Sequence, residues 1–328
     1  MRPTRRQVAF ITLPWMALAA CTATSVLAQP TAAFPSRPVT IVVPTPAGGP
    51  SDTAARLVAR VLQAGWGQPV VVENKVGAGG AVAAKAVQSA APDGHTLLWA
   101  QASMAGMPFV QTNAPYRTLA DFAPVSQVVG FGYAMFVTRE LPVNTYADFV
   151  ALARAQPDKL NFATGTLGEY MVAMHVFKAA GVQAQRVPYK GGAQLMPDLI
   201  GGQVQVNFGP ILSGLQHVKA GKLKILATAL PQRSAQLPDV PTFTELGLPP
   251  GDLPTWNALF APAGTPADTT ARIASAVAAA LKDPAVRATL EANGADPIGS
   301  TPAQLSAAVE TATAAWRRFV RDYSIPLE

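Results

Sequence analysis

The sequence predicts an α/β protein made of two lobes, and three observations lead to that expectation. Short apolar runs rich in β-branched residues alternate with segments of helical periodicity along most of the chain. The chain has 328 residues, 49% of them hydrophobic, which is enough to bury the cores of two domains. Charged residues make up only 13%, a composition that argues against a disordered or coiled-coil chain.

Residues 1–28 are typical of an export signal. Three arginines lie within the first six residues, and the apolar stretch 8–20 that follows is too short to span a bilayer comfortably. Small residues predict cleavage after Ala28, whereas the letters LAAC ending at Cys21 are typical of a lipoprotein signal cleaved before that cysteine. A loose twin-arginine pattern leaves the export route open. Both cleavage sites predict a periplasmic protein, either soluble or lipid-anchored through Cys21.

Charge and residue types exclude several classes of function. The formal net charge of +6 includes the three N-terminal arginines, which leaves +3 without a basic block, so no nucleic-acid partner is expected. Cys21 is the only cysteine, and the histidines His95, His175 and His217 lack metal-site spacing. Nucleotide-binding glycine motifs and a catalytic serine motif are missing from the sequence. We therefore predict no catalytic residue, no metal and no cofactor.

The first lobe is expected to start as a βαβ series. Val39–Val43 is typical of a buried parallel strand, and a Pro/Gly turn over 44–50 separates it from a helix that Ser51 or Asp52 is expected to cap. The next expected elements are a strand at 70–72, a helix ending at residue 88 and a strand at 96–99. This alternation favours a parallel sheet with right-handed crossovers.

The alternation continues in a second lobe and then returns to the first. Thr145 is expected to cap a helix. The later expected strands are 161–163, 185–188, 204–208 and 223–227, and the helices are 167–180, 194–200 and 211–220. A return strand at 257–261 and a helical C-terminal region predict that lobe 1 is discontinuous. We expect lobe 1 at 34–130 plus 256–328 and lobe 2 at 131–255, with hinge crossings near 130–133 and 253–257.

Two glycine-containing loops, one in each lobe, form the candidate binding site. The first has the letters PTPAGGPSD at 44–52, and the second has ATGTLG at 163–168. Each follows a strand and precedes a helix, so backbone N–H groups, hydroxyls and a helix N-terminus can bind an anion without any Lys or Arg. Either loop alone would also fit an ordinary capped turn, but the two together predict a carboxylate site in a cleft between the lobes.

The chain resembles the Bug family, the extracytoplasmic receptors of tripartite tricarboxylate transporters. The resemblance starts near Phe34 and runs to the C-terminus in order. It includes FPSRPVTIVVPTPAGGPSD (34–52), GQPVVVENKVGAGG (67–80), LNFATGT (160–166), VPYKGG (187–192) and LPDVPTFTELGLP (237–249). The resemblance implies a type II periplasmic-binding-protein fold, in which two Rossmann-like α/β lobes are joined by a two-strand hinge with the ligand cleft between them.

The resemblance also implies which residues bind the ligand. It places the carboxylate on the two loops, at Ala47, Gly48, Ser51, Asp52, Thr164, Gly165 and Thr166. This chain departs from the family where relatives often carry an aspartate near residue 208, because it reads Asn207-Phe208-Gly209. The loss of that carboxylate is expected to weaken selection for a ligand amine. Tyr170, with Phe131 or Tyr133 near the hinge, is expected to make a roomier, partly aromatic pocket beside Gly209. The alternative is that these aromatic rings pack in cores or in the hinge.

The sequence therefore predicts a receptor rather than an enzyme. It is expected to capture a small carboxylate-containing molecule, which is a dicarboxylate, a tricarboxylate, an acidic amino acid or an aromatic acid. Its partners are expected to be the membrane components of a tripartite tricarboxylate-type transporter, and the protein is expected to be a monomer. The alternatives are an orphan periplasmic protein that reports its ligand to a signalling partner, and an extracytoplasmic enzyme.

Overall fold

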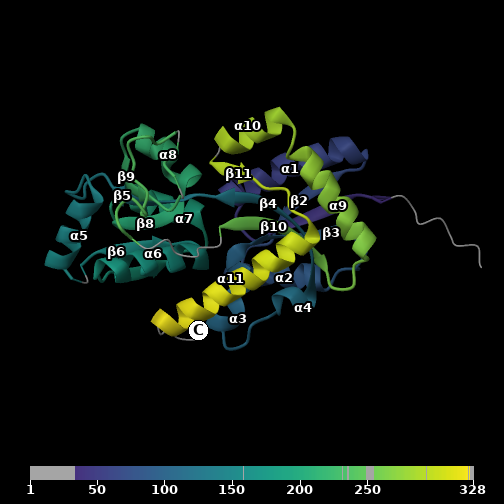
Figure 1. Ribbon diagram of the computed structural model, residues 1–328, viewed down its shortest axis with the longest axis horizontal. Helices are drawn as coiled ribbons and strands as arrows, with labels where there is room; N and C mark the ends of the chain where they lie inside the picture. The colour runs from purple at the N-terminus through teal and green to yellow at the C-terminus, as the bar shows by residue number, and fades with distance from the viewer. Residues whose placement is uncertain are drawn as a thin grey trace, which may run out of the picture. The chain divides into compact units, whose positions relative to one another are not determined.

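A computed structural model describes residues 34–157, 159–230, 232–234, 236–248, 255–292, 294–323 and 325. These residues form two β-sheets, and each sheet has its own helices (Figure 1). The expected export signal at 1–28, with its two cleavage sites, lies outside the described residues. Among the helices that the structure describes, none combines the length and the apolar character needed to cross a membrane.

The six-stranded sheet has the strand order β11-β4-β10-β3-β1-β2. Its strands are β1 (Val39–Val43), β2 (Val70–Asn74), β3 (Thr96–Gln101), β4 (Phe122–Phe131), β10 (Trp256–Pro262) and β11 (Ala295–Pro297). As predicted, β1 pairs in parallel with β2 and β3. The predicted return strand is also confirmed: β10 lies between β3 and β4 and is antiparallel to both.

The five-stranded sheet has the strand order β7-β6-β8-β5-β9. Its strands are β5 (Tyr133–Thr138), β6 (Asn161–Thr164), β7 (Gln185–Pro188), β8 (Val206–Pro210) and β9 (Leu223–Thr228). β6 is parallel to β7 and β8, whereas β5 is antiparallel to β8 and β9. β4 and β5 are not among the predicted strands, and they connect the two sheets through Gly132. The residue boundaries expected for the two lobes stay a prediction.

Helices cover both sheets. With the six-stranded sheet lie α1 (Pro50–Trp66), η1 (Ala78–Gly80), α2 (Ala81–Gln88), η2 (Ala102–Ala105), α3 (Met107–Val110), α4 (Thr118–Asp121), α9 (Ala267–Ala280), α10 (Pro284–Ala292) and α11 (Pro302–Tyr323). With the five-stranded sheet lie α5 (Tyr146–Ala155), α6 (Leu167–Ala180), α7 (Gly192–Ile200) and α8 (Ile211–Lys219). Side chains of β1 alternate between two cores, because Ile41 packs with α1 and α9 while Val42 packs with α2 and α11.

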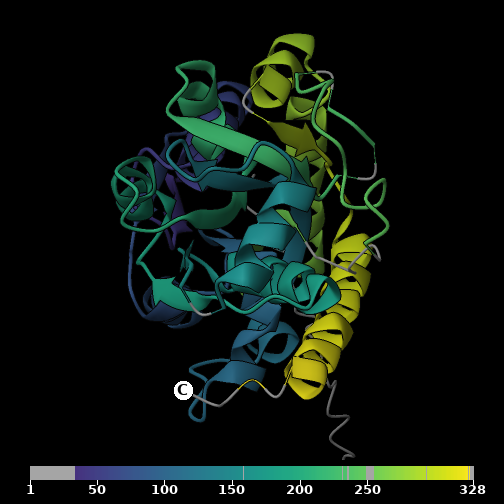
Figure 2. The same ribbon diagram turned by 90° about the vertical axis from the view of Figure 1, so that its left-hand side faces the viewer.

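The long helix α11, yellow in Figure 2, also contacts the other sheet's helices. The ring of Phe319 meets the ring of Tyr170 on α6 edge to face, with centroids 6.0 Å apart. The Tyr323 hydroxyl lies 3.2 Å from Nδ1 of His175, also on α6. The C-terminal half of α11 therefore packs against the helix that follows the second glycine-containing loop.

Two helix starts show how the sequence sets local structure. Thr145 caps α5 as predicted, and a reciprocal bond to Asp148 completes a capping box. The prediction that Ser51 or Asp52 caps α1 is wrong, because the N-cap residue is Gly49 and the helix begins at Pro50. Proline suits this first position, since its missing N–H would have no partner there. Ser51 and Asp52 are therefore inside the first turn, where their side chains take other roles.

Candidate functional site

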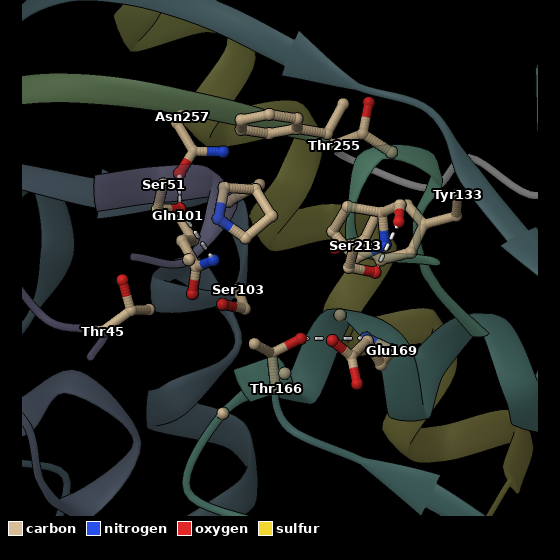
Figure 3. A pocket seen from close by; sticks show the side chains of 18 of the residues that line it. Thr45, Ser51, Gln101, Ser103, Tyr133, Thr166, Glu169, Ser213, Thr255 and Asn257 are labelled. Carbon is tan, nitrogen blue, oxygen red and sulfur yellow. Dashed lines mark hydrogen bonds between the residues drawn. The ribbon is translucent and has the colours of Figure 1, made fainter. Parts of the chain in front are cut away.

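A cavity lies where loops of the two sheets meet (Figure 3). The six-stranded sheet contributes the β1–α1 loop, the end of β3 with η2, and the start of β10. The five-stranded sheet contributes the start of β5, the β6–α6 and β7–α7 loops, and the end of β8. The cavity has a volume of about 60 Å³.

Asp52 stabilises the first loop through hydrogen bonds of its carboxylate. Its Oδ2 accepts the backbone N–H of Gly48 over 2.9 Å, and its Oδ1 accepts Nδ2 of Asn74 over 2.8 Å. The guanidinium of Arg56 also donates to this carboxylate. Burial by itself raises the pKa of Asp52, but the hydrogen bonds from Arg56, Gly48 and Asn74 outweigh it and lower the pKa below its usual value. Asp52 is therefore an ionised loop-forming residue that does not line the cavity.

Asn257 points an amide donor into the cavity. Its Oδ1 accepts the Ser51 hydroxyl over 2.8 Å and the indole N–H of Trp99 over 3.1 Å. An indole nitrogen can only donate, so this pair fixes which end of the amide is the oxygen. The nitrogen Nδ2 then faces the cavity, and it has no acceptor among the residues that the structure describes (Figure 3). Because Ser51 gives its single proton to Asn257, its hydroxyl is not a donor for a ligand.

Further donors lie at the start of α1. Within the described part of the chain, the backbone N–H groups of Ser51 and Asp52 have no acceptor, as is usual for a first helical turn. The hydroxyl of Thr45 is buried without a hydrogen-bond partner, and Thr45 lines the cavity. These donors and the positive end of the helix dipole favour an anion. The wall beside α1 is thus suited to a carboxylate.

The second loop repeats the construction of the first. Thr166 caps α6 by accepting the N–H of Glu169 over 3.2 Å. Oε2 of Glu169 accepts the backbone N–H of Gly165 over 2.6 Å and Nδ2 of Asn207 over 3.2 Å. In both lobes, the acidic residue at the third position of the helix binds the glycine N–H four residues earlier. The two acids differ in their exposure to the cavity and in their pKa. Glu169 lines the cavity, and burial raises its pKa to about 7.

The structure brings only part of the predicted site together. Three of the ten predicted residues line the cavity: Ser51, Phe131 and Thr166. Gly48 instead borders a neighbouring groove. Ala47, Asp52, Thr164, Gly165, Tyr170 and Gly209 are not among the residues that line the cavity. The two predicted loops therefore form part of the cavity wall, but through a different set of residues from the one predicted.

Tyr170 and Gly209, expected in an aromatic pocket, have other surroundings. The ring of Tyr170 stacks on Phe162 with centroids 6.3 Å apart, and the guanidinium of Arg186 lies 4.1 Å from the ring centre. Gly209 sits so close to Asn207 that an added Cβ would lie 2.5 Å from its Oδ1. The predicted alternative, core packing, describes Tyr170 better. The aromatic side chains that do line the cavity are Phe131, Tyr133 and Trp256.

Asn257 and Glu169 were missed as site residues. Asn257 is a single polar residue in the apolar strand WNALFAP, which is a weak signal that the strand ends at a site. Glu169 follows the second loop by one turn, at the same helical position that Asp52 occupies after the first. Comparing the two loops residue by residue would therefore have identified Glu169 as a candidate.

Comparisons with known proteins give the family. The family model for the tripartite tricarboxylate transporter family receptor matches residues 54–325. Protein BugT of Bordetella pertussis is 33% identical over 312 residues, which cover 93% of this chain and 96% of BugT. Among solved structures, the periplasmic binding protein BugD has a TM-score of 0.84 at 30% identity, covering 90% of this chain and all of BugD.

Two similar solved structures contain diacids. An R. palustris protein with adipate has a TM-score of 0.85 at 30% identity, and the match covers 90% of this chain and all of that protein. MatC from Rhodopseudomonas palustris with malate has a TM-score of 0.79 at 33% identity, and the match covers 88% of this chain and all of MatC. These likenesses confirm the predicted two-lobed periplasmic-binding-protein fold. The chain belongs to the tripartite tricarboxylate transporter receptor family, whose members are solute-binding proteins and not enzymes.

Proposed function

We propose that this receptor binds a small carboxylate-bearing molecule with its carboxylate at the start of α1. The receptor then presents this molecule to the membrane components of a tripartite tricarboxylate-type transporter. The family supports a receptor role, and adipate and malate in two similar proteins support a carboxylate ligand. The expected export signal at 1–28 supports a periplasmic place of action.

The observation that carries this proposal is the fixed amide of Asn257. Its Oδ1 is held by two donors from different elements, Ser51 on α1 and Trp99 on β3, so Nδ2 is oriented before any ligand arrives. The Thr45 hydroxyl and the first-turn N–H groups of α1 supply further donors to the same wall. A carboxylate needs several donors and a positive potential, and both are present here without a cationic side chain.

The proposed site explains how a charge is held without a counter-ion. Each well-formed hydrogen bond to a charged group contributes about 1.5–3 kcal/mol. The amide of Asn257 and two backbone N–H groups would therefore provide about 5–9 kcal/mol, and contacts to the rest of the ligand must offset the entropic cost of association. Preorganisation matters because the donors do not have to give up internal partners to bind the ligand.

The test is Asn257→Asp, measured by calorimetry against a panel of small acids. Aspartate keeps the shape of asparagine and can still accept from Ser51 and Trp99, but it replaces the Nδ2 donor by a carboxylate oxygen. Binding of every acid should weaken at least a hundredfold. Asn113→Asp is the matched control, because it adds the same charge at an exposed position that does not line the cavity. Unchanged affinity in Asn257→Asp would refute this site.

A further inference from the structure

One carboxyl group lines the cavity, and no cationic side chain among the described lining residues can pair with it. Among the described residues that line the cavity, only Glu169 has a side chain that takes a charge near neutral pH. The cavity-lining set contains no Lys, Arg or His within the described chain. Glu169 is 2% exposed, so water does little to screen it. The cavity therefore has a helix N-terminus on one wall and a buried acid on the other.

Only one of the two oxygens of the Glu169 carboxyl group accepts hydrogen bonds from the protein. Oε2 accepts hydrogen bonds from the N–H of Gly165 at 2.6 Å and from Nδ2 of Asn207 at 3.2 Å. Oε1 accepts none from the residues that the structure describes. Oε1 does not belong to the fully buried atoms without a partner, so it opens toward the cavity that Glu169 lines. The position thus lacks a hydrogen-bond donor, and the cavity is the space from which a donor can come.

The groups packed around Glu169 are neutral. Tyr133 faces it from β5, Asn207 from β8, and Thr166 and Gly165 from the loop before α6. Burial raises the pKa of Tyr133 as well, so its hydroxyl stays protonated at physiological pH. No positively charged group of the described residues forms an ion pair with Glu169. Apart from the N-terminus of α6, on which Glu169 lies, no described group compensates its negative charge.

We infer that the ligand is a small zwitterion whose carboxylate lies at the start of α1 and whose amine pairs with Glu169. The inference rests on the proposed carboxylate site and specifies the other end of the same ligand. An ammonium group supplies both the donor that Oε1 lacks and the charge that the walls lack. A second carboxylate in that place would face a buried like charge with no cation between them. Glu169 is thus a specificity-determining residue that favours amino acids over diacids.

The protonation of Glu169 fits this role. Burial raises its pKa to about 7, because no cationic side chain stabilises the ionised form. An adjacent ammonium would favour the ionised form and bring the pKa down. Binding of an amino acid should therefore release protons near pH 7, and its affinity should rise between pH 6 and pH 8. Binding of a diacid should show the opposite trend, because it needs Glu169 in its neutral form.

The experiment compares matched acids on protein that has been unfolded and refolded to remove any bound solute. For each chain length from three to six carbons, the panel holds the α- and ω-amino acids, the ω-hydroxy acid, the simple monoacid and the diacid, with malate added. Affinities are measured by calorimetry at pH 8. We expect at least one amino acid to bind ten or more times more tightly than the diacid and the hydroxy acid of its length. A diacid that binds as tightly as every amino acid of its length would overturn the inference.

Glu169→Gln supplies the second readout. Glutamine has the same shape, and its oxygen can accept from Gly165 and Asn207 while its nitrogen replaces Oε1. The ratio of the affinity for the amino acid to the affinity for the diacid should fall below threefold. The affinity for simple monoacids should not change. Glu310→Gln, an exposed change of the same charge on α11, should keep the full preference. An unchanged preference in Glu169→Gln would also overturn the inference. If this variant does not fold, the pH dependence of the wild-type protein decides instead.

The outcomes separate this inference from the proposed function. If diacids bind best and Asn257→Asp abolishes their binding, the carboxylate site stands and the zwitterion inference is wrong. If no acid of the panel binds, or if Asn257→Asp has no effect, the proposed function fails and this inference fails with it. If an amino acid binds best, loses affinity in Asn257→Asp and loses its preference in Glu169→Gln, both hold.

Discussion

The Glu169 carboxylate accepts a hydrogen bond of 2.6 Å from the backbone N–H of Gly165, the glycine four residues before it. Asp52 and Gly48 repeat this relationship in the other lobe over 2.9 Å. The surroundings then separate the two acids, because Arg56 donates to Asp52 and lowers its pKa, whereas Glu169 has no cation and burial raises its pKa. The same loop construction thus holds a permanent anion in one lobe and a titrating group in the other.

Stability should fall as pH rises through the range in which Glu169 titrates. The folded protein keeps the proton up to a pKa of about 7, whereas the unfolded chain loses it near the ordinary value of 4.5. The folded state therefore binds more protons between these values, and its stability declines as pH rises from about 4.5 to about 7. The full effect is about 3 kcal/mol. Glu169→Gln should remove this decline, and urea unfolding at pH 5 and pH 8 measures it.

Glu310→Gln serves as the control for that pH dependence. It removes an exposed carboxylate from α11, so the wild-type slope should persist. Equal slopes in wild type and Glu169→Gln would mean that Glu169 is already ionised in the folded protein at acidic pH.

Asp52→Asn should destabilise the first loop at neutral pH. Asparagine keeps one acceptor for Gly48 but loses the charge that pairs with Arg56, at a cost of about 1–3 kcal/mol. Because the pKa of Asp52 is lowered, the contribution is present above the ordinary pKa of 3.8 and is lost as pH falls below it. The difference between wild type and variant should therefore shrink on acidification. Thermal unfolding at pH 7 and pH 3 tests this, with the exposed Asp268→Asn as control.

Gly165→Ala should force two cavity loops apart. A Cβ at residue 165 would lie 2.7 Å from the carbonyl carbon of Gly191 and 2.8 Å from the nitrogen of Gly192. Both contacts are backbone atoms, so the β6–α6 and β7–α7 loops must shift, which typically costs about 1–3 kcal/mol. Gly192→Ala is the matched control, since its Cβ would meet nothing within 4 Å. Equal melting temperatures for the two variants would contradict the close loop contact.

Trp99→Phe should weaken ligand binding without changing the cavity wall. The substitution removes the indole N–H that holds Oδ1 of Asn257, so only Ser51 remains to orient the amide. A single hydrogen bond of this kind contributes about 0.5–1.5 kcal/mol, so affinity should fall about two- to tenfold. Calorimetry with the tightest acid of the panel measures the change. Trp66→Phe, a tryptophan packed against Phe34, should leave affinity unaltered.

The elements with strong local signals were predictable from the sequence. The strand Val39–Val43 and the helix Leu167–Ala180 have the predicted bounds, because the first is a β-branched run and the second lies between a capping threonine and a terminating glycine. β4 and β5 were missed since Gly132 alone lies between them, without the longer polar turn that usually separates strands. The predicted N-cap of α1 at Ser51 or Asp52 is wrong because Pro50 favours the first helical position, which makes Gly49 the N-cap.

The candidate site depends on contacts that no local pattern specifies. Ser51 and Asn257 are 206 residues apart, and their hydrogen bond exists only because β10 returns to lie beside β3. The two predicted loops were located from their glycines. Which of their residues face the cavity depends on the internal hydrogen bonds of Asp52 and Glu169, which turn Gly48 and Gly165 into supporting positions. Loop sequence therefore identified the region and two of its lining residues, Ser51 and Thr166, but not Asn257 or Glu169.

The place of β10 between β3 and β4 sets the order in which this chain can fold. A nascent chain that ends before residue 256 has all strands of the five-stranded sheet, but β3 and β4 lack the strand that joins them. Both would be open edges, which attract other chains, until the last quarter of the sequence is synthesised. Pairings of such long sequence separation also fold slowly. A cell that exports this protein must therefore keep the chain from aggregating until its C-terminal segment arrives.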